Sequence, residues 1–212
     1  MAKNLYVICG KSSTGKDTIY KKIVETFDGI LSPVVLHTSR EIRSGEKDGI
    51  NYHYISKEDF LKKIDSQNMI EYRSYPHTNG EVFYGTSIDA FEDNKSYITI
   101  NTLEGLKKLK DSPYMREINI HPIYIEVPDM DRIQRALKRE SKNFIPNIKE
   151  CCRRYLADEE EFAEEKIKSL VTSCNRFISK SLENWLLQIS LYITGIEKEA
   201  KLYYNENDRD YC

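Results

Sequence analysis

The chain has 212 residues, of which 40% are hydrophobic and 31% charged, and its formal net charge is −2. This length suits one globular domain, and the hydrophobic fraction is too high for a disordered chain. A charge this close to neutral argues against a nucleic-acid partner, which favours a strongly basic surface. No apolar run approaches the roughly 20 residues that cross a bilayer. We therefore expect a globular protein with neither a nucleic-acid nor a membrane partner.

The cysteines show no metal-ligand spacing and are odd in number. They are Cys9, Cys151, Cys152, Cys174 and Cys212. The first apolar stretch, residues 5–9, is too short for a signal peptide and has no cleavage signal after it. A reduced compartment fits this usage best, so the expected location is cytoplasmic.

Strand-like and helix-like stretches alternate along most of the chain, which predicts a parallel sheet covered by helices. A buried strand is expected at residues 5–9 and a helix at 16–27, where Ile19, Ile23 and Val24 share one face. Further strands are expected at residues 34–38, 97–101, 122–127 and 177–178. A last helix is expected at residues 181–193.

Two segments interrupt this alternation. Residues 40–89 are rich in Tyr and Gly and carry short strand patterns at 52–55, 69–72 and 82–84, which predicts a small β-rich insertion. Residues 140–147 are polar, contain Pro146 and lie between arginines, which predicts a mobile loop. The expected organisation is one domain over 1–212. Its parts are a core of about 1–38 and 90–195, an insertion of about 39–89, a lid of about 139–153 and a polar tail, 196–212, to which no function is assigned.

A glycine-rich segment directly follows the first expected strand and opens the first helix. It reads Gly10, Lys11, Ser12, Ser13, Thr14, Gly15, Lys16, the GxxxxGK core of a phosphate-binding P-loop. Glycines let backbone N–H groups turn inward around a β-phosphate, and the helix N-terminus adds partial positive charge. Lys16 would reach the β- and γ-phosphates. The segment, with the two residues after it, predicts an ATP site.

The position after the P-loop lysine departs from the motif. It carries Asp17, followed by Thr18, where the motif has Ser or Thr to bind Mg²⁺ through a hydroxyl. A carboxylate is a good oxygen ligand for Mg²⁺, directly or through water. It also brings negative charge close to the triphosphate. We therefore expect Mg²⁺ at Asp17 and Thr18, and weak ATP binding without the metal.

Residues 37–52 place Arg40 and Arg43 three residues apart, beside a glycine turn and Tyr52. Arginine forks bind phosphate oxygens in pairs, so this block suits a dianionic phosphate. Taken together, the block resembles the guanylate kinase family. The family's own pattern over this block is T-T-R-x-x-R-x-G-E-x-x-G-x-x-Y. Later family segments are matched by Ile70-Glu71-Tyr72, Tyr84-Gly85-Thr86-Ser87, Arg135 to Arg139, and Arg153 with Ala157 and Glu160. The resemblance spans roughly residues 4–193.

The resemblance implies an α/β fold of the P-loop NTPase type, with a parallel sheet flanked by helices, a β-rich acceptor-binding insertion and a helical lid. It implies that ATP, with Mg²⁺, phosphorylates GMP. Four residues would hold the acceptor phosphate: Arg40, Arg43, Tyr52 and Tyr84. Glu71 would accept hydrogen bonds from the guanine N1–H and 2-amino group, with Thr86 and Asn101 beside the base. The catalytic cations would be Lys16, Arg40, Arg43 and the lid residues Arg135, Arg139 and Arg153.

Two positions depart from the family and leave the acceptor base open. Leu36 stands where the family has Ser, and the segment before Gly105 lacks the family's D-x-D, so that Asn101 or Thr102 takes its place. Sequences with GKD also occur in P-loop kinases for other nucleoside monophosphates and for phosphorylated sugars such as a ribose bisphosphate. A third alternative is a non-catalytic binding module, but such modules lose the P-loop that is intact here. Oligomeric state is not indicated.

Overall fold

The computed structural model describes residues 3–43, 45–77, 80–91, 95–142, 146–179 and 181–207. Its central sheet has five strands in the order β2-β7-β1-β8-β9, and all neighbours are parallel. The strands are β1 (Lys3–Cys9), β2 (Leu31–Pro33), β7 (Ser96–Ile100), β8 (Ile118–Glu126) and β9 (Arg176–Ile178). The predicted α/β fold with a helix-flanked parallel sheet is confirmed.

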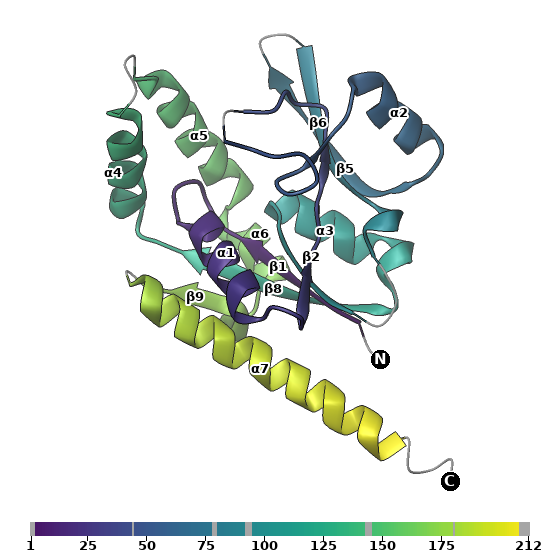
Figure 1. Ribbon diagram of the computed structural model, residues 1–212. Coiled ribbons are helices and arrows are strands. Elements are labelled where there is room, and N and C mark those ends of the chain that lie inside the picture. Colours follow the sequence, from purple (N-terminus) through teal and green to yellow (C-terminus); the bar gives the residue numbers. More distant parts are fainter. Residues whose placement is uncertain are drawn as a thin grey trace.

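The residues of β1 alternate between two hydrophobic clusters, one on each face of the sheet. Leu5 and Val7 pack in a cluster that includes residues of α3 (Leu103–Asp111) and α6 (Glu164–Leu170). Tyr6 and Ile8 pack in the other, with residues of α1 (Lys16–Thr26) and α7 (Leu182–Asn207). A strand buried on both faces is typical of a parallel sheet between two helical layers. This sandwich fixes the carboxyl end of β1, where the P-loop begins (Figure 1).

A second sheet lies beside the first and has the strand order β4-β3-β6-β5. Its strands are β3 (His37–Thr38), β4 (His53–Tyr54), β5 (Met69–His77) and β6 (Gly80–Ser87). The expected β-rich insertion is therefore present, but α2 (Lys57–Asp65), inside it, was not predicted. The sequence signal for this helix was its N-terminal cap, Ser56, whose hydroxyl accepts from the Asp59 backbone N–H. Phe60 of the helix packs in a small cluster with Met69 and Phe83.

The strand expected at residues 34–38 was wrong. The core edge strand is β2, whose last residue, Pro33, has no N–H and suits an edge. After one more backbone bond, from Val34 N to Ile98 O at 2.9 Å, the chain leaves the core. His37 and Thr38 then join the second sheet, so the strand pattern was real but belonged to the insertion.

The lid expected at about residues 139–153 takes in the end of α4 (Asp129–Glu140) and the first turns of α5 (Ile148–Glu161), and these two helices form a hairpin (Figure 1). The mobile loop predicted at residues 140–147 includes residues 143–145, which lie outside the described residues. Three short 3₁₀ helices complete the described elements: η1 (Ile88–Ala90), η2 (Pro113–Met115) and η3 (Ser173–Asn175).

The polar segment expected after residue 195 is helical as far as it is described, because α7 continues to Asn207. Glu197 anchors this extension. Its Oε1 accepts from the Tyr6 hydroxyl at 2.8 Å and from Asn4 Nδ2 at 3.0 Å. Burial, and then the hydrogen bond to Glu197, raise the pKa of Tyr6. None of the described helices is long and apolar enough to cross a membrane.

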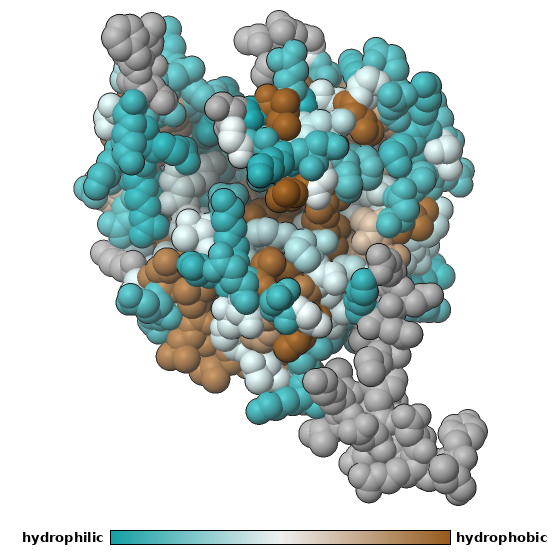
Figure 2. Space-filling model, viewed as in Figure 1, coloured by the Kyte–Doolittle hydropathy of each residue, from teal (hydrophilic) through white to brown (hydrophobic). Residues whose placement is uncertain are grey.

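The two faces of α7 allow a direct stability test. Ile189 is fully buried against the sheet, whereas Leu191 is 65% exposed. Figure 2 shows an apolar area over the first half of α7. Ile189→Ala should lower the free energy of unfolding by about 2–5 kcal/mol, because it leaves a cavity in the core. Leu191→Ala should change it by less than about 0.5 kcal/mol. Urea unfolding of both variants measures the difference, and equal effects would contradict the packing of α7.

Candidate active site

The P-loop joins β1 to α1 and has the strand–loop–helix context that its motif requires. A Cβ on Gly10 would lie 2.5 Å from the Ile125 backbone oxygen, so only glycine lets the loop leave β1 this close to β8. Gly15 caps α1 with φ 94°, a left-handed conformation that favours glycine. Ser13 also has a positive φ of 64°. The chain therefore wraps tightly at the start of the helix.

This wrapping leaves a ring of unpaired donors. Among the described residues, the backbone N–H groups of residues 13–17 have no hydrogen-bond acceptor. The Ser13 hydroxyl is also buried without a partner. The Lys16 ammonium folds back to the Lys11 backbone oxygen at 3.4 Å. Open amides at a helix N-terminus, next to an ammonium, form an anion-binding site.

Asp158, which the sequence interpretation missed, holds one side of the loop. Its carboxylate accepts from the Ser12 backbone N–H at 2.8 Å and from the Ser12 hydroxyl at 3.1 Å. Arg132, which is only 2% exposed, donates to the same carboxylate at 3.0 Å. No motif distinguishes Asp158 from the other acids of its helix. Ser12, assigned to ATP from the motif, is therefore engaged with the protein itself in this structure.

The three predicted lid arginines are not brought together. Arg135 lies at the P-loop, where its guanidinium donates to the Thr14 backbone oxygen at 3.1 Å. Arg139 is exposed in the last turn of α4. Arg153 is exposed on α5 and donates to Glu150 at 2.7 and 2.8 Å. Hydrogen bonds from Arg153, with weaker help from Arg154, lower the pKa of Glu150 to about 2.

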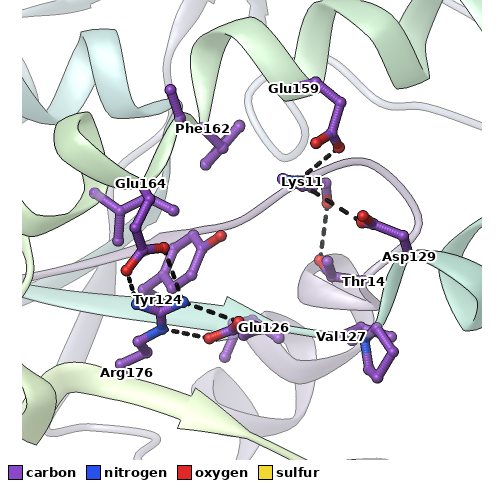
Figure 3. Close-up of a pocket in the computed structure, with 14 residues that line it drawn as sticks. Lys11, Thr14, Tyr124, Glu126, Val127, Asp129, Glu159, Phe162, Glu164 and Arg176 are labelled. Carbon is purple, nitrogen blue, oxygen red and sulfur yellow. Dashed lines mark hydrogen bonds and ion pairs between the residues drawn. The ribbon is translucent and has the colours of Figure 1, made fainter.

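A pocket of about 290 Å³ borders the P-loop at Lys11 and Thr14 (Figure 3). Its charged lining residues are Lys11, Glu126, Asp129, Glu159, Glu164 and Arg176. Lys11 pairs with Glu159 at 2.6 Å, and Arg176 pairs with Glu126 and Glu164. Four acids against two cations repel a triphosphate, so we do not assign this pocket to ATP. The Lys11 side chain points into it, which leaves Lys11 only its backbone for a phosphate.

Arg40 is the centre of the predicted acceptor site and is 8% exposed. Its Nε donates to the Tyr84 hydroxyl at 3.1 Å, and its two terminal nitrogens donate to Glu46 at 2.9 and 3.0 Å. These bonds lower the pKa of Glu46 to about 2. The Arg43 side chain is exposed, and only its backbone N–H reaches Glu46, at 2.9 Å. Glu46 occupies the acidic position of the family pattern, so its role could have been inferred.

Tyr52 packs against two other residues of the predicted acceptor site. Its ring lies 5.7 Å from that of Tyr84, and the Arg40 guanidinium lies 5.5 Å from its centre. Burial raises the pKa of Tyr52, the neighbouring Tyr84 raises it further, and the Arg40 guanidinium lowers it. Tyr52 therefore belongs to the same cluster as Arg40 and Tyr84.

The predicted base-reading residues do come together. Glu71 Oε1 accepts from the Thr86 hydroxyl at 2.9 Å and from Asn101 Nδ2 at 3.3 Å. Arg73, which the sequence interpretation missed, places its Nε 3.2 Å from Glu71 Oε2. The sequence could have identified Arg73 as a neighbour of Glu71, because it lies two residues later on the same face of a strand. Leu36, at the family's Ser position, is a core residue that packs with the cluster of Leu5.

The predicted Mg²⁺ ligands, Asp17 and Thr18, are exposed in the first turn of α1. Both offer oxygen, the donor that Mg²⁺ prefers, and the ion ordinarily keeps several waters and binds substrate phosphates. Among the described residues no group of three His, Cys, Asp or Glu side chains could enclose a metal. The donors therefore suit an ion that arrives with a nucleotide, rather than a cage made by protein alone.

The contact between Asp158 and the P-loop can be tested by mutation. Asp158→Ala should weaken Mg-ATP binding roughly tenfold or more, because Ser12 loses its support and the buried Arg132 keeps only Asp129 and Glu159 as carboxylate partners. Calorimetric titration with Mg-ATP measures the affinity, and thermal unfolding reports the accompanying loss of stability. Glu165→Ala, an exposed acid on the next helix, is the control. An unchanged affinity in Asp158→Ala would contradict the assigned support.

Comparisons with known proteins agree with this arrangement. The family model described as guanylate kinase matches residues 2–174. A guanylate kinase of Schizosaccharomyces pombe is 32% identical over 136 residues, which are 62% of this chain and 63% of that protein. One of Lactiplantibacillus plantarum is 30% identical over 190 residues, 82% of this chain and 90% of that protein. The crystal structure of guanylate kinase from Anaplasma phagocytophilum has the same fold, with a TM-score of 0.63, 20% identity, and coverage of 92% of this chain and 86% of that one. The chain therefore belongs to the guanylate kinase family.

Proposed function

We propose that this protein transfers the γ-phosphate of ATP to GMP, giving ADP and GDP. The observation that carries the proposal is the pairing of two anion sites. The open amides of residues 13–17 with Lys16 suit the donor phosphates. The Arg40 cluster, on the neighbouring sheet, suits the acceptor phosphate.

The reaction requires positioning and charge neutralisation rather than a protein nucleophile, because the attacking group is already a phosphate oxygen. The backbone N–H groups of the loop and Lys16 would hold the β- and γ-phosphates. Arg40, with the hydroxyls of Tyr52 and Tyr84, would aim the acceptor oxygen. Mg²⁺, held near Asp17 and Thr18, would neutralise phosphate charge when bound with ATP.

The lid would act by closure. Arg139 and Arg153 are exposed in this structure, so they reach the transferring phosphate only if α4 and α5 move towards the second sheet. Arg135 is already at the P-loop. Closure would also exclude water, which otherwise competes as the acceptor.

The same features bear on the alternatives. A non-catalytic module has no use for the open amides and Lys16, so an enzyme is favoured. The substrates would be ATP and GMP, both small molecules.

The described cysteines, Cys9, Cys151, Cys152 and Cys174, are free thiols, in keeping with the cytoplasmic location that we propose.

A coupled assay of ADP formation tests the acceptor. With Mg-ATP, the wild type should turn over GMP in preference to AMP, UMP and ribose bisphosphate. Preference for a ribose phosphate, with no turnover of GMP, would overturn the proposal.

Lys16→Ala should reduce turnover of GMP by orders of magnitude, because it removes the ammonium that neutralises the β/γ oxygens. The melting temperature should stay close to that of the wild type. Lys21→Ala, an exposed lysine on the same helix, should keep full activity. Near-normal turnover in Lys16→Ala would refute the role of the P-loop.

Asp17 should make ATP binding depend on the metal. Its carboxylate repels the triphosphate when Mg²⁺ is absent, so adding EDTA should weaken ATP binding strongly in the wild type. Asp17→Ser should bind metal-free ATP more tightly than the wild type does. Titration calorimetry with ATP, with and without Mg²⁺, measures both. Equal ATP affinity in the two conditions would count against the prediction.

A further inference from the structure

One oxygen of the Glu71 carboxylate is already used by the protein. Oε1 accepts from both Thr86 and Asn101, which fills the two lone pairs that a carboxylate oxygen offers. Oε2 is buried and has no hydrogen-bond partner among the described residues. The carboxylate therefore has one free oxygen for a ligand, whereas guanine carries two neighbouring donors, N1–H and the 2-amino group.

Arg73 supplies a donor next to that free oxygen. Its Nε lies 3.2 Å from Glu71 Oε2 but is not aligned to hydrogen-bond it, and this N–H too is buried without an acceptor. The guanidinium is fixed at its far end, because Nη1 donates to Thr102 Oγ1 at 2.8 Å. A Cβ at residue 105 would lie 2.7 Å from Nη1, so Gly105 makes room for it.

Stability alone does not explain this placement. Arg73 lies beside Thr102, the N-terminal cap of α3, where the helix dipole disfavours a cation. The side chains of Arg73 and Glu71 are 4% and 0% exposed, and a buried ion pair whose hydrogen bonds are incomplete is a poor stabiliser. A buried acceptor and a buried donor thus lie side by side as an ion pair, and neither atom has a hydrogen-bond partner among the described residues. Because the pair is closed to solvent, the residues around it have to move to admit a base.

We infer that this pair reads the acceptor base, with Arg73 donating to O6 and Glu71 Oε2 accepting from N1–H. The 2-amino group then has no acceptor on Glu71. The acceptors would be 6-oxopurine nucleoside monophosphates as a class, IMP as well as GMP. Adenine presents the opposite pattern, an acceptor at N1 and a donor at position 6, and is rejected at both points. The inference rests on the proposed function, since it assumes that a purine monophosphate is the acceptor.

The first test compares GMP with IMP in the wild type, because the two differ only in the 2-amino group. The kcat/KM for IMP should lie within tenfold of that for GMP, and that for AMP should be at least a thousandfold lower. A gap of more than tenfold between GMP and IMP overturns the inference, because it shows that the 2-amino group is read. This comparison needs no variant and so does not depend on how a mutant folds.

The second test removes the donor. Arg73→Met keeps the length of the side chain and should lower kcat/KM for GMP and for IMP alike, by about tenfold to a hundredfold, through the lost bond to O6. Arg73→Lys should recover part of this, while Arg116→Met, at an exposed arginine, should change nothing. Melting temperatures show whether Arg73→Met folds, and if it does not, the comparison of GMP with IMP in the wild type decides the inference alone. A loss of less than threefold for both acceptors, in a folded variant, overturns the role of Arg73.

The outcomes separate the two proposals. If neither GMP nor IMP is phosphorylated although Mg-ATP binds, the proposed function fails. If GMP is phosphorylated well and IMP is not, the proposed function stands and only this inference fails.

Discussion

The structure depends on how the chain leaves β1. The P-loop must expose several backbone N–H groups in one direction, although a buried N–H without an acceptor is unfavourable. Glycine permits the turn at residues 10 and 15, and the packed strands β1 and β8 fix where it starts. Asp158 then holds the outer side of the loop through Ser12. A loop braced in this way keeps its donors aimed at a phosphate before any phosphate arrives, and binding does not have to order it.

Carboxylates of the chain also hold two of the arginines proposed to bind phosphate. Glu46 binds the fork of Arg40 in the proposed acceptor site, and Glu150 binds Arg153 on the lid. These acids orient the guanidiniums. An incoming phosphate would meet a geometry that already suits an anion, and it would have to compete with the resident carboxylate. Affinity therefore reflects a difference between two ion pairs rather than the full strength of one.

Patterns local in sequence predicted most of the framework. The P-loop, four of the five core strands and the gathering of Thr86 and Asn101 beside Glu71 follow from short motifs and a family pattern. What was missed depends on contacts distant in the chain. Asp158 is one acid among several on α5 until the fold brings it to Ser12. The strand at His37 and Thr38 has an ordinary strand pattern, but only the tertiary fold assigns it to the second sheet. Arg73 lies only two residues from Glu71 on β5, but the contact that fixes its guanidinium, to Thr102, exists only in the folded chain.

The two ends of the hairpin formed by α4 and α5 differ in how they are held by the rest of the protein. At its base, Arg132 binds Asp158, Arg135 binds the P-loop, and Glu161 accepts from the Leu103 backbone N–H at 3.1 Å. These contacts join both helices to the loop and to α3. Further along the two helices, Arg139 and Arg153 are exposed and bind nothing buried. A lid motion that preserves the base contacts would swing the distal ends, and it would carry cations towards the proposed acceptor site without disturbing the amides proposed to hold the donor.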